Sequence, residues 1–369
     1  MRIAFLGDIA PLGSFDISNF NKVNWEQLRI IADYLATFDY VIGNLECPFS
    51  RAKKVSGAKS AYLCCNIDNI HLLTFLHITH LNIANNHIFD FGVEGYETTK
   101  EILDDNNIEW FGAEGKTAKI ENKVNSLILD GFCCYSTNPR KCVKYGTYGI
   151  NEFDVDTVKS RLAEYKKKQY FPIISIHTGT EHVNYPDINN IKIARDFAEI
   201  TPYIYYGHHP HVLQGFEFYK NSLIAHSLGN FIFDDIINQD GKCQLELTQN
   251  NRTSCILDVE IDNNRIISYK IKSIKIAKGT INFVDQPVIS PESVSYLKQE
   301  FDKQPARYQA KRQAMIDCWT LERKAQRNIS WYIKHLRWRY FLLLFTNKLN
   351  YYKYKIHFLN KVRAISNRY

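Results

Sequence analysis

The chain has 369 residues, of which 45% are hydrophobic and 23% are charged. This composition is typical of a folded globular protein, and it excludes a wholly disordered chain, a collagen-like repeat and a heavily charged solvating chain. The formal net charge of +7 is unevenly spread. Residues 301–369 carry 16 Lys and Arg against three acids, which leaves 30 basic and 36 acidic residues in the rest of the chain. The sequence therefore predicts an acidic body followed by a strongly basic C-terminal part.

Short β-branched runs alternate with amphipathic stretches from residue 1 to about residue 285. The pattern predicts strands at 3–6, 40–42, 81–84, 127–129, 173–176, 204–206 and 223–225. It predicts helices between them, at 25–35, 69–76, 95–104, 155–167 and 191–199, and then a hairpin of strands 254–261 and 266–276. Because each crossover is long enough to hold a helix, this rhythm favours an α/β fold.

From about residue 290 the character of the sequence changes. Residues 291–327 are expected to be helical, and after Glu322 the chain has twelve Lys and Arg and eleven aromatic residues but no acid. We therefore expect a body of residues 1–285 and a helical, basic and aromatic extension of residues 290–369. Two interpretations of the extension stay open: its aromatic residues pack onto the body, or residues 331–345 contact an anionic membrane surface or a partner. Nucleic acid is not expected as a partner, since no recognisable nucleic-acid motif accompanies these residues.

The first residues and the nine cysteines predict a compartment. The chain opens with an apolar strand that ends in an acid, and it lacks the long apolar segment of a signal peptide. The cysteines are odd in number and show no CxxC spacing. The longest unbroken apolar run, residues 340–345, is far shorter than the roughly 20 residues of a membrane-spanning helix. We therefore expect reduced thiols in a cytoplasmic protein, peripheral at the inner face of the membrane if the extension binds lipid.

Polar residues gather at the predicted carboxyl ends of five strands, the edge of an α/β sheet at which ligands bind. In chain order they are Asp8, then Asn44 and Glu46, then Asn85, Asn86, His87 and Asp90, then His177, and finally His208, His209 and His211. Imidazole, carboxylate and amide groups together suit Mn, Fe or Zn, and no cysteine lies among them. The sequence therefore predicts a site for one or two divalent transition-metal ions of the kind used in phosphoester hydrolysis.

Plainer interpretations of these residues stand beside the metal site. A single aspartate such as Asp8 is more often a turn or helix-cap residue, and Asn85-Asn86 is also common turn chemistry. The occurrence of these residues in order with the other polar residues at strand ends favours metal binding. We expect His209 and His211 to point to the same side of an extended segment. Glu181 is a candidate for orienting His177, whereas His208 is expected to support the site as a buried imidazole.

Six motifs occur in order over residues 1–235. They are Gly7-Asp8, Asn44-Leu45-Glu46, residues 84–92 (ANNHIFDFG), residues 177–181 (HTGTE), residues 207–211 (GHHPH) and residues 227–231 (SLGNF). In this order they resemble the CapA-type capsule synthesis family, which is associated with poly-γ-glutamate and lies within the calcineurin-like metallophosphoesterase superfamily. The resemblance implies a four-layer α/β/β/α sandwich with a di-metal centre.

The resemblance also implies roles for individual residues. The implied metal ligands are Asp8, Glu46, Asn86, His177, His209 and His211. The implied catalytic residues are His87, which protonates the leaving group or contacts the phosphate, and its neighbour Asp90. Two positions depart from the superfamily pattern: Ala10 replaces a usual histidine, and Asn44 replaces a bridging aspartate for which Glu46 is the candidate substitute.

Three functions follow as hypotheses. The first is a metal-dependent, phosphoesterase-like hydrolase in capsule or surface-polysaccharide biosynthesis. The second is an amide-acting poly-γ-glutamate hydrolase or transferase that uses the same site. The third, suggested by Ala10 and Asn44, is a non-catalytic capsule-assembly factor.

Overall fold

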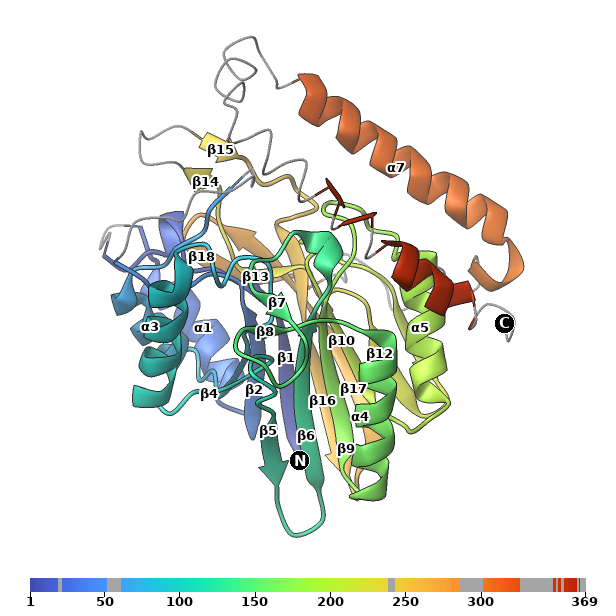
Figure 1. Ribbon diagram of the computed structural model, residues 1–369. Helices are drawn as coiled ribbons and strands as arrows, with labels where there is room; N and C mark the ends of the chain where they lie inside the picture. The colour runs from blue at the N-terminus through green and yellow to red at the C-terminus, as the bar shows by residue number, and fades with distance from the viewer. Residues whose placement is uncertain are drawn as a thin grey trace.

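The computed structural model describes residues 1–18, 22–51, 61–237, 243–285, 301–325, 348–349, 351–352, 355–363 and 365. Two β-sheets pack face to face, and helices cover the outer face of each (Figure 1). The described chain therefore forms the four-layer α/β/β/α sandwich that the family resemblance implies.

The first sheet has the strand order β18-β17-β16-β1-β2-β3-β4, and β13 pairs with the end of β1. Its strands are β1 (Arg2–Ile9), β2 (Tyr40–Leu45), β3 (His80–Asn82), β4 (Glu109–Phe111), β13 (Asn230–Ile232), β16 (Thr253–Asp262), β17 (Arg265–Ala277) and β18 (Thr280–Phe283). β1 to β4 run parallel, and β16 to β18 continue the sheet antiparallel. The expected hairpin is confirmed: Asn263 and Asn264 form its turn, both with positive φ, as a two-residue turn requires.

The second sheet has the order β11-β12-β10-β9-β6-β5, with parallel pairing among β6, β9, β10 and β12. Its strands are β5 (Ala118–Glu121), β6 (Ser126–Cys133), β9 (Phe171–His177), β10 (Ile204–His208), β11 (Phe216–Tyr219) and β12 (Ser222–Ala225). Two small ribbons pair β7 (Cys142–Val143) with β8 (Ile150–Asn151) and β14 (Ile236–Ile237) with β15 (Cys243–Leu245). The sequence pattern missed several strands of two to four residues, because so few residues show no clear alternation.

Several helices begin at a residue whose side chain caps them. α1 (Trp25–Leu35), α2 (Ile70–Phe75) and α3 (Gly92–Asp105) accompany the first sheet, and α4 (Val155–Lys167) and α5 (Ile188–Ala198) accompany the second (Figure 1). Single-turn 3-10 helices are η1 (Gly13–Phe15), η2 (Ile67–Asn69) and η3 (Tyr135–Thr137). The Asn24 side chain accepts from the amide of Gln27, and Asp154 accepts from Thr157, so α1 and α4 start where their donors are satisfied.

The space between the sheets is filled by alternate residues of neighbouring strands. Phe5, Ile42, Ile173, Tyr206 and Leu257 are fully or almost fully buried there. Side chains along a strand point alternately to its two faces, so the residues between them pack against the helices instead. Burying a large apolar side chain of this kind contributes about 1.5–3 kcal/mol. This core fixes the two sheets against each other, and with them the strand ends that carry the polar clusters.

The described parts of the C-terminal extension lie against the body. α7 (Pro305–Ala325) buries Tyr308, whose hydroxyl donates to the Pro186 carbonyl at 2.9 Å. Further along, Lys361 pairs with Asp154 at 2.7 Å, and Ile365 is buried beside the helices of the second sheet. The boundary expected between residues 285 and 290, and the basic aromatic stretch 331–345, lie outside the described residues, so the two-part division stays a prediction.

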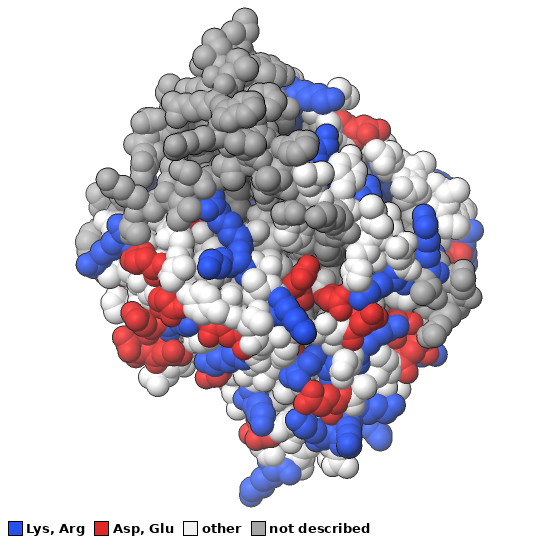
Figure 2. All heavy atoms as spheres, viewed as in Figure 1, with Lys and Arg blue, Asp and Glu red and all other residues white. Residues whose placement is uncertain are grey.

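Basic and acidic side chains are interspersed over the described surface of the face shown in Figure 2. None of the helices in the described part of the chain is both long enough and apolar enough to span a membrane.

The cysteines differ from the expectation of nine reduced thiols. Cys47 and Cys65 form a disulfide, and the other seven are free. The two residues are 18 positions apart, and a short parallel bridge between Phe49 and Cys65 brings their segments together. The sequence-based interpretation considered only closely spaced cysteines and so missed this pair. Disulfides persist mainly in oxidising compartments, so the bond weighs against the cytoplasmic localisation, which stays a prediction.

Candidate metal centre

Two glycines bring the strand ends close enough to form a site. A Cβ on Gly7 of β1 would lie 2.2 Å from the Gly229 carbonyl oxygen. A Cβ on Gly207 of β10 would lie 2.1 Å from the His226 carbonyl oxygen. Both strands therefore touch the backbone of residues 226–229, which any side chain at these glycines would push away. This contact explains why the Gly-Asp, GHHPH and SLGNF motifs occur together.

Asp8 lies at the end of β1, fully buried, and its carboxylate is surrounded by donors. His208 Nδ1 donates to Oδ1 at 2.8 Å, Asn44 Nδ2 donates to the same oxygen at 2.9 Å, and the amide of His209 donates to Oδ2 at 3.3 Å. Burial by itself raises the pKa of Asp8, but the hydrogen bond from His208 and the nearby histidines lower it to about 2. Asp8 is therefore held as a carboxylate, and His208 supports it as expected.

Glu46 follows β2 and is also fully buried, but its side chain has different surroundings. Neither carboxyl oxygen has a hydrogen-bond partner among the described residues. Oε1 lies 3.4 Å from His177 Nε2 and 3.5 Å from His211 Nε2. Burial and the neighbouring charge of Asp8 raise the pKa of Glu46 well above its usual value. A buried carboxylate without donors is costly unless a cation accompanies it, which makes Glu46 the centre of the candidate site.

Asn44 is turned away from the role of a bridging ligand. Its Nδ2 donates to Asp8, and its Oδ1 accepts from Asn82 Nδ2 at 3.0 Å. Both ends of the amide are therefore used to hold Asp8 against the third strand of the sheet. The carboxylate two residues later, Glu46, faces the histidines, as proposed for the departure from the superfamily pattern.

His177 ends β9 and is fully buried. Its Nε2 lies 2.8 Å from Asn86 Oδ1, which brings together two of the residues expected to bind metal. Its Nδ1 has no hydrogen-bond partner in the described part of the chain, so Glu181 does not orient this ring through a hydrogen bond. Burial and the neighbouring histidines lower the pKa of His177 well below its ordinary value, which keeps the imidazole neutral as a ligand must be.

His209 and His211 reach the site by a route that the sequence did not indicate. β10 ends at His208, and both residues have positive φ, 97° and 56°. The expectation of an extended segment is therefore wrong, because the chain bends sharply after the strand. Backbone of this kind is strained for residues other than glycine and persists where the surrounding structure enforces it, commonly at functional sites. His211 Nδ1 is held by Asn230 Oδ1 at 2.9 Å, which leaves Nε2 toward Glu46.

His87 and Asp90 form a pair at the edge of the cluster. His87 Nδ1 lies 2.6 Å from Asp90 Oδ2, and the same oxygen accepts the amide of Leu63 at 3.0 Å. Asp90 is fully buried, whereas His87 keeps a small exposed fraction. Asp90 is therefore placed to position His87 rather than to touch a substrate itself. Leu63 belongs to the segment that the disulfide holds through Cys65.

Sequence reasoning missed two asparagines that support the centre. Asn82 at the end of β3 donates to Asn44, and Asn251 donates from Nδ2 to the His211 carbonyl at 3.0 Å. Asn82 carries a signal that the strand-end argument could have used, since it ends a strand beside Asn44. Asn251 carries none, because it lies in a turn far along the chain.

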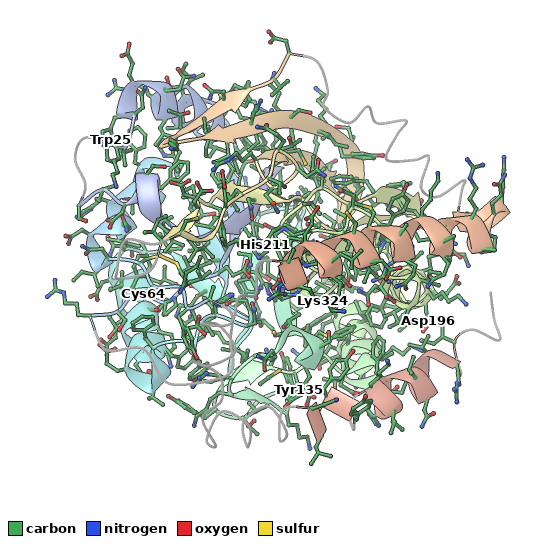
Figure 3. The ribbon with its side chains drawn as sticks, turned by 90° about the horizontal axis from the view of Figure 1, so that it is seen from above. Trp25, Cys64, Tyr135, Asp196, His211 and Lys324 are labelled. Carbon is green, nitrogen blue, oxygen red and sulfur yellow. A yellow bond between two sulfur atoms is a disulfide. The ribbon has the colours of Figure 1, made fainter. Side chains whose placement is uncertain are left out.

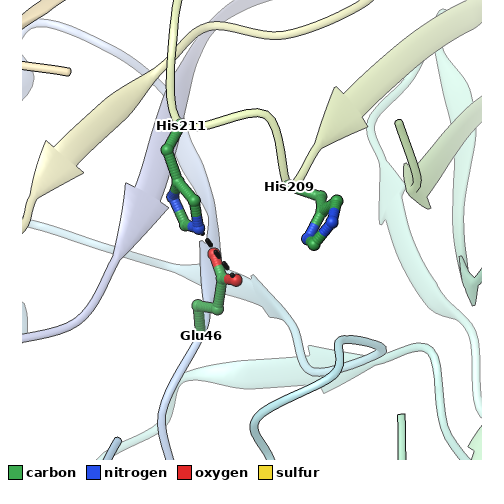
Figure 4. A group of neighbouring side chains, drawn as sticks. All are labelled: Glu46, His209 and His211. Atoms are coloured by element: carbon green, nitrogen blue, oxygen red, sulfur yellow. Dashed lines mark ion pairs between the residues drawn. The ribbon is translucent and has the colours of Figure 1, made fainter. Parts of the chain in front are cut away.

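The potential ligand atoms fall into two groups that share Glu46. One consists of Glu46, His209 and His211 (Figure 4), and the other of Asp8, Glu46 and His177; within each group the ligand atoms lie within 4.8 Å of one another. Among the described residues, the buried atoms left without hydrogen bonds include both Glu46 oxygens, His177 Nδ1 and His209 Nδ1. A mixed set of carboxylate oxygens and imidazole nitrogens with such unsatisfied atoms fits a divalent transition metal.

Family membership rests on the same residues. A family model described as "Bacterial capsule synthesis protein PGA_cap" matches residues 2–235. The chain belongs to this family. The match contains both sheets except the strands from β14 onward, and it includes every residue of the candidate metal centre named above apart from Asn251.

Relatives of the chain include two capsule proteins. The "PGA biosynthesis protein CapA" of Bacillus subtilis (strain 168) is 30% identical over 203 residues, which are 53% of each chain. The "Capsule biosynthesis protein CapA" of Bacillus anthracis is 28% identical over 220 residues, 56% of this chain and 53% of that protein. The chain thus spans about half the length of the curated relatives it matches.

Solved structures with a similar fold are more distant. A hypothetical protein from Thermus thermophilus aligns with a TM-score of 0.45 at 12% identity, over 75% of this chain and 100% of that chain. A putative 5'-nucleotidase from Staphylococcus aureus aligns with a TM-score of 0.42 at 12% identity, over 82% and 58%. Neither likeness indicates an activity for this PGA_cap protein.

Proposed function

We propose that this PGA_cap protein is a metal-dependent hydrolase that acts on a phosphoester in capsule or surface-polysaccharide biosynthesis. The observation that carries the proposal is the Glu46 carboxylate, which is fully buried and has no hydrogen bond to either oxygen in the described chain. A structural carboxylate in this position would be paired with donors, whereas a metal ligand needs its oxygens free.

Six residues would hold the metal: Asp8, Glu46, Asn86, His177, His209 and His211. Both candidate groups contain Glu46, which would therefore take part in holding one ion or two. Bound there, divalent ions would polarise the phosphoryl group and lower the pKa of water for attack. Around the centre, His208 and Asn44 fix the Asp8 carboxylate, and Asn230 fixes the ring of His211.

The chain's own proton donor in this proposal is His87. Its Nδ1 is bound to Asp90, which fixes the orientation of the ring. A histidine oriented in this way can deliver a proton to a leaving oxygen, as general acid catalysis requires. Asp90 acts through His87 and, through the Leu63 amide, ties that ring to the disulfide-held segment.

A second candidate function is a non-catalytic assembly factor. It is favoured by Ala10, a fully buried alanine in the place where the superfamily pattern has a histidine. The loss of one imidazole would lower the affinity of the site for one of the two ions. A protein that binds metal and turns over neither phosphoesters nor γ-glutamyl amides would support this candidate over the hydrolase.

Location and membrane contact remain part of the proposal. A capsule precursor carried on a lipid would place the enzyme at a membrane surface, with the basic residues of the extension facing anionic headgroups. Sedimentation of the full chain with vesicles of anionic and of neutral lipid tests this contact. Equal partition to both would remove the membrane surface from the proposal.

The test combines metal analysis with an activity screen. Elemental analysis of the purified protein is expected to show one or two transition-metal ions per chain. Activity is screened on phosphate mono- and diesters and on a γ-glutamyl peptide, which separates ester from amide chemistry. Asp8→Ala is expected to remove both metal and turnover, whereas His71→Ala, which removes an exposed histidine of α2, is expected to change neither. Turnover that survives Asp8→Ala would refute the proposed centre.

A further inference from the structure

α7 presents one continuous face to the body. Tyr308 and Arg312 on this face are buried, and Trp319 and Arg323 are half-buried. The spacings of four, seven and four residues place all four on the same side of a helix. Figure 1 shows α7 crossing the top of the sandwich from the side of α5. The helix is therefore a fixed part of the described fold above the carboxyl ends of the strands.

The anchors of α7 all lie in the loop that follows β9. Tyr308 donates to the Pro186 carbonyl at 2.9 Å, and Arg312 Nη2 lies 3.0 Å from Asp187 Oδ2 and 3.0 Å from Thr180 Oγ1. This loop begins directly after His177, a candidate metal ligand. Because the loop is held at both ends, the position of α7 is fixed relative to the metal centre.

The second half of α7 reaches the centre itself. The Trp319 ring lies 3.9 Å from the ring of His182, measured between centroids, and His182 lies 6.4 Å from His211. His182 Nδ1 is held by the Asn251 side chain, which also donates to the His211 carbonyl. Seen from above, the end of α7 that carries Lys324 lies beside His211 (Figure 3).

Two cations lie at this end of the helix. The Arg323 guanidinium carbon lies 5.8 Å from the centroid of Trp319, and Lys324 is exposed. In the part of the chain that the structure describes, neither side chain has a carboxylate within ion-pair distance. Burial raises the pKa of Glu181, but His209, His211, His182 and Arg323 together lower it to about 2.

We propose that the C-terminal end of α7 is a wall of the substrate site, where Arg323 and Lys324 bind an anionic oxygen group of the substrate, carboxylate or phosphate. This group lies outside the bond that is cleaved, and Trp319 forms the apolar side of the subsite. The inference rests on the proposed function in one respect, that the metal centre marks where the substrate lies.

The chemistry of the two side chains suits this ligand. A guanidinium binds a carboxylate or a phosphate with two parallel hydrogen bonds, and a lysine adds a mobile point charge. The carboxylates of the metal centre would repel a substrate that carries several anionic groups. Cations beside the centre would offset this repulsion where the next anionic group of the substrate lies. The family match ends at residue 235, so this subsite lies in a part of the chain that the family pattern does not cover.

The test measures binding by the metal-loaded full chain, without turnover. A γ-linked glutamate pentamer and a glycerol-phosphate pentamer are titrated calorimetrically at 0.15 M salt, so that the two arms separate carboxylate from phosphate recognition. The double variant Arg323→Ala, Lys324→Ala is expected to weaken binding of one probe about tenfold or more, the range of a lost charge-assisted contact. Arg323→Lys keeps the charge but loses the two parallel hydrogen bonds, so it is expected to retain only part of the affinity.

The control is Arg307→Ala, which removes one cation from an exposed position of α7. It lies 16 residues from Arg323, or about 24 Å along the helix, and is expected to leave affinity within about twofold. The subsite is refuted if wild-type protein binds neither probe, if the double variant binds both normally, or if Arg307→Ala weakens binding equally. Thermal melting checks that each variant is folded.

The two proposals fail in different ways. Binding that depends on Arg323 without any hydrolysis would keep the subsite and remove the hydrolase. Hydrolysis that depends on Asp8 with unchanged binding in the double variant would keep the hydrolase and remove the subsite.

Discussion

Two buried carboxyl groups in this protein have the same degree of burial and opposite surroundings. Asp130 of β6 accepts from the hydroxyls of Tyr165 at 2.6 Å and Tyr145 at 3.2 Å and from the amide of Gly131 at 2.9 Å. Glu46 accepts no hydrogen bond within the described residues. Both are fully buried, and burial raises the pKa of each.

The difference distinguishes a structural buried carboxyl from one that binds a ligand. A carboxyl whose oxygens are used by hydroxyl and amide donors is part of the structure, because its cost of burial is already offset. A carboxyl with unused oxygens and neutral imidazoles beside it is arranged for a cation that is supplied from outside. Asp130 therefore belongs to the packing under α4, and Glu46 belongs to a ligand site.

The largest expected effect comes from substitutions at the metal centre, which test the distinction between Glu46 and Asp130. Glu46→Gln and His209→Ala are each expected to lower kcat/KM by more than the roughly 100-fold that losing an outer-shell partner costs. Each is also expected to release metal, measured by elemental analysis after gel filtration. Asp130→Asn is the control and is expected to keep both. If Asp130→Asn lowers metal content as much as Glu46→Gln, the distinction between the two carboxyls fails.

Metal removal gives the next effect, this time on stability. Metal at about 1,000 times its dissociation constant stabilises the folded state by about 4 kcal/mol, so chelation is expected to lower Tm strongly. Glu46→Gln is expected to abolish the difference between metal-loaded and chelated protein. Its metal-free form is expected to melt above the metal-free wild type. Because the pKa of Glu46 is raised, the metal-free wild type must bury a charge or take up a proton there at neutral pH, whereas the amide requires neither. A chelator that leaves the wild-type Tm unchanged would contradict both expectations.

Much of this centre was predictable because parallel strands end at one edge. Asp8, His177 and His208 end three strands, and the chain order of the motifs put them together without any knowledge of side-chain contacts. The α/β layering followed from the alternation of strands and helices for the same reason. Both inferences use local pattern and topology, which a single sequence contains.

Other features depend on contacts that a local pattern does not encode. His209 and His211 have positive φ angles that neither residue favours, so their backbone depends on the surrounding fold. The meeting of Trp319 with His182 joins segments 137 positions apart in the sequence. The pairing of Cys47 with Cys65 depends on how the segment after β2 returns to the sheet. Such contacts follow only from the three-dimensional arrangement.

The disulfide provides a third test of the comparison, since it constrains the segment beside Glu46 and not the one beside Asp130. Cys47 follows Glu46, and Cys65 holds the segment whose Leu63 amide contacts Asp90. The bond closes a loop of 18 positions, for which chain entropy predicts a stabilisation of slightly more than about 3 kcal/mol. Cys65→Ser is therefore expected to lower the free energy of unfolding by about this amount and to reduce activity through His87.

Reductant provides the control for this prediction. Wild-type protein under reductant is expected to match Cys65→Ser, and reductant is expected to leave the variant unchanged. Thiol titration of the denatured wild type is expected to find seven free thiols without reductant and nine with it. Nine thiols without reductant would show that the pair is not bonded in the purified protein.

The smallest expected effect tests the structural carboxyl through pH. Burial raises the pKa of Asp130 from 3.8 to about 6, against the opposing effects of the Tyr165 hydrogen bond, the Arg161 charge and the Tyr145 hydrogen bond. Between these values the folded state binds a proton that the unfolded state has released, so the contribution of Asp130 to stability falls as pH rises from about 4 to about 6. A shift of about two pKa units corresponds to a loss of at most about 3 kcal/mol across that range. Above about pH 6 the contribution is constant.

Asp130→Asn removes this titration while keeping the shape of the side chain, and the Tyr165 hydroxyl can turn to accept from the new amide. Urea unfolding of chelated wild type and variant, measured at intervals from pH 4 to pH 7, isolates the contribution from that of the metal. The stability difference between wild type and variant is expected to shift against the wild type as pH rises to about 6 and then to level off. A difference that stays constant over the whole range would show that the pKa of Asp130 is not raised in the folded state, so that its partners offset the effect of burial.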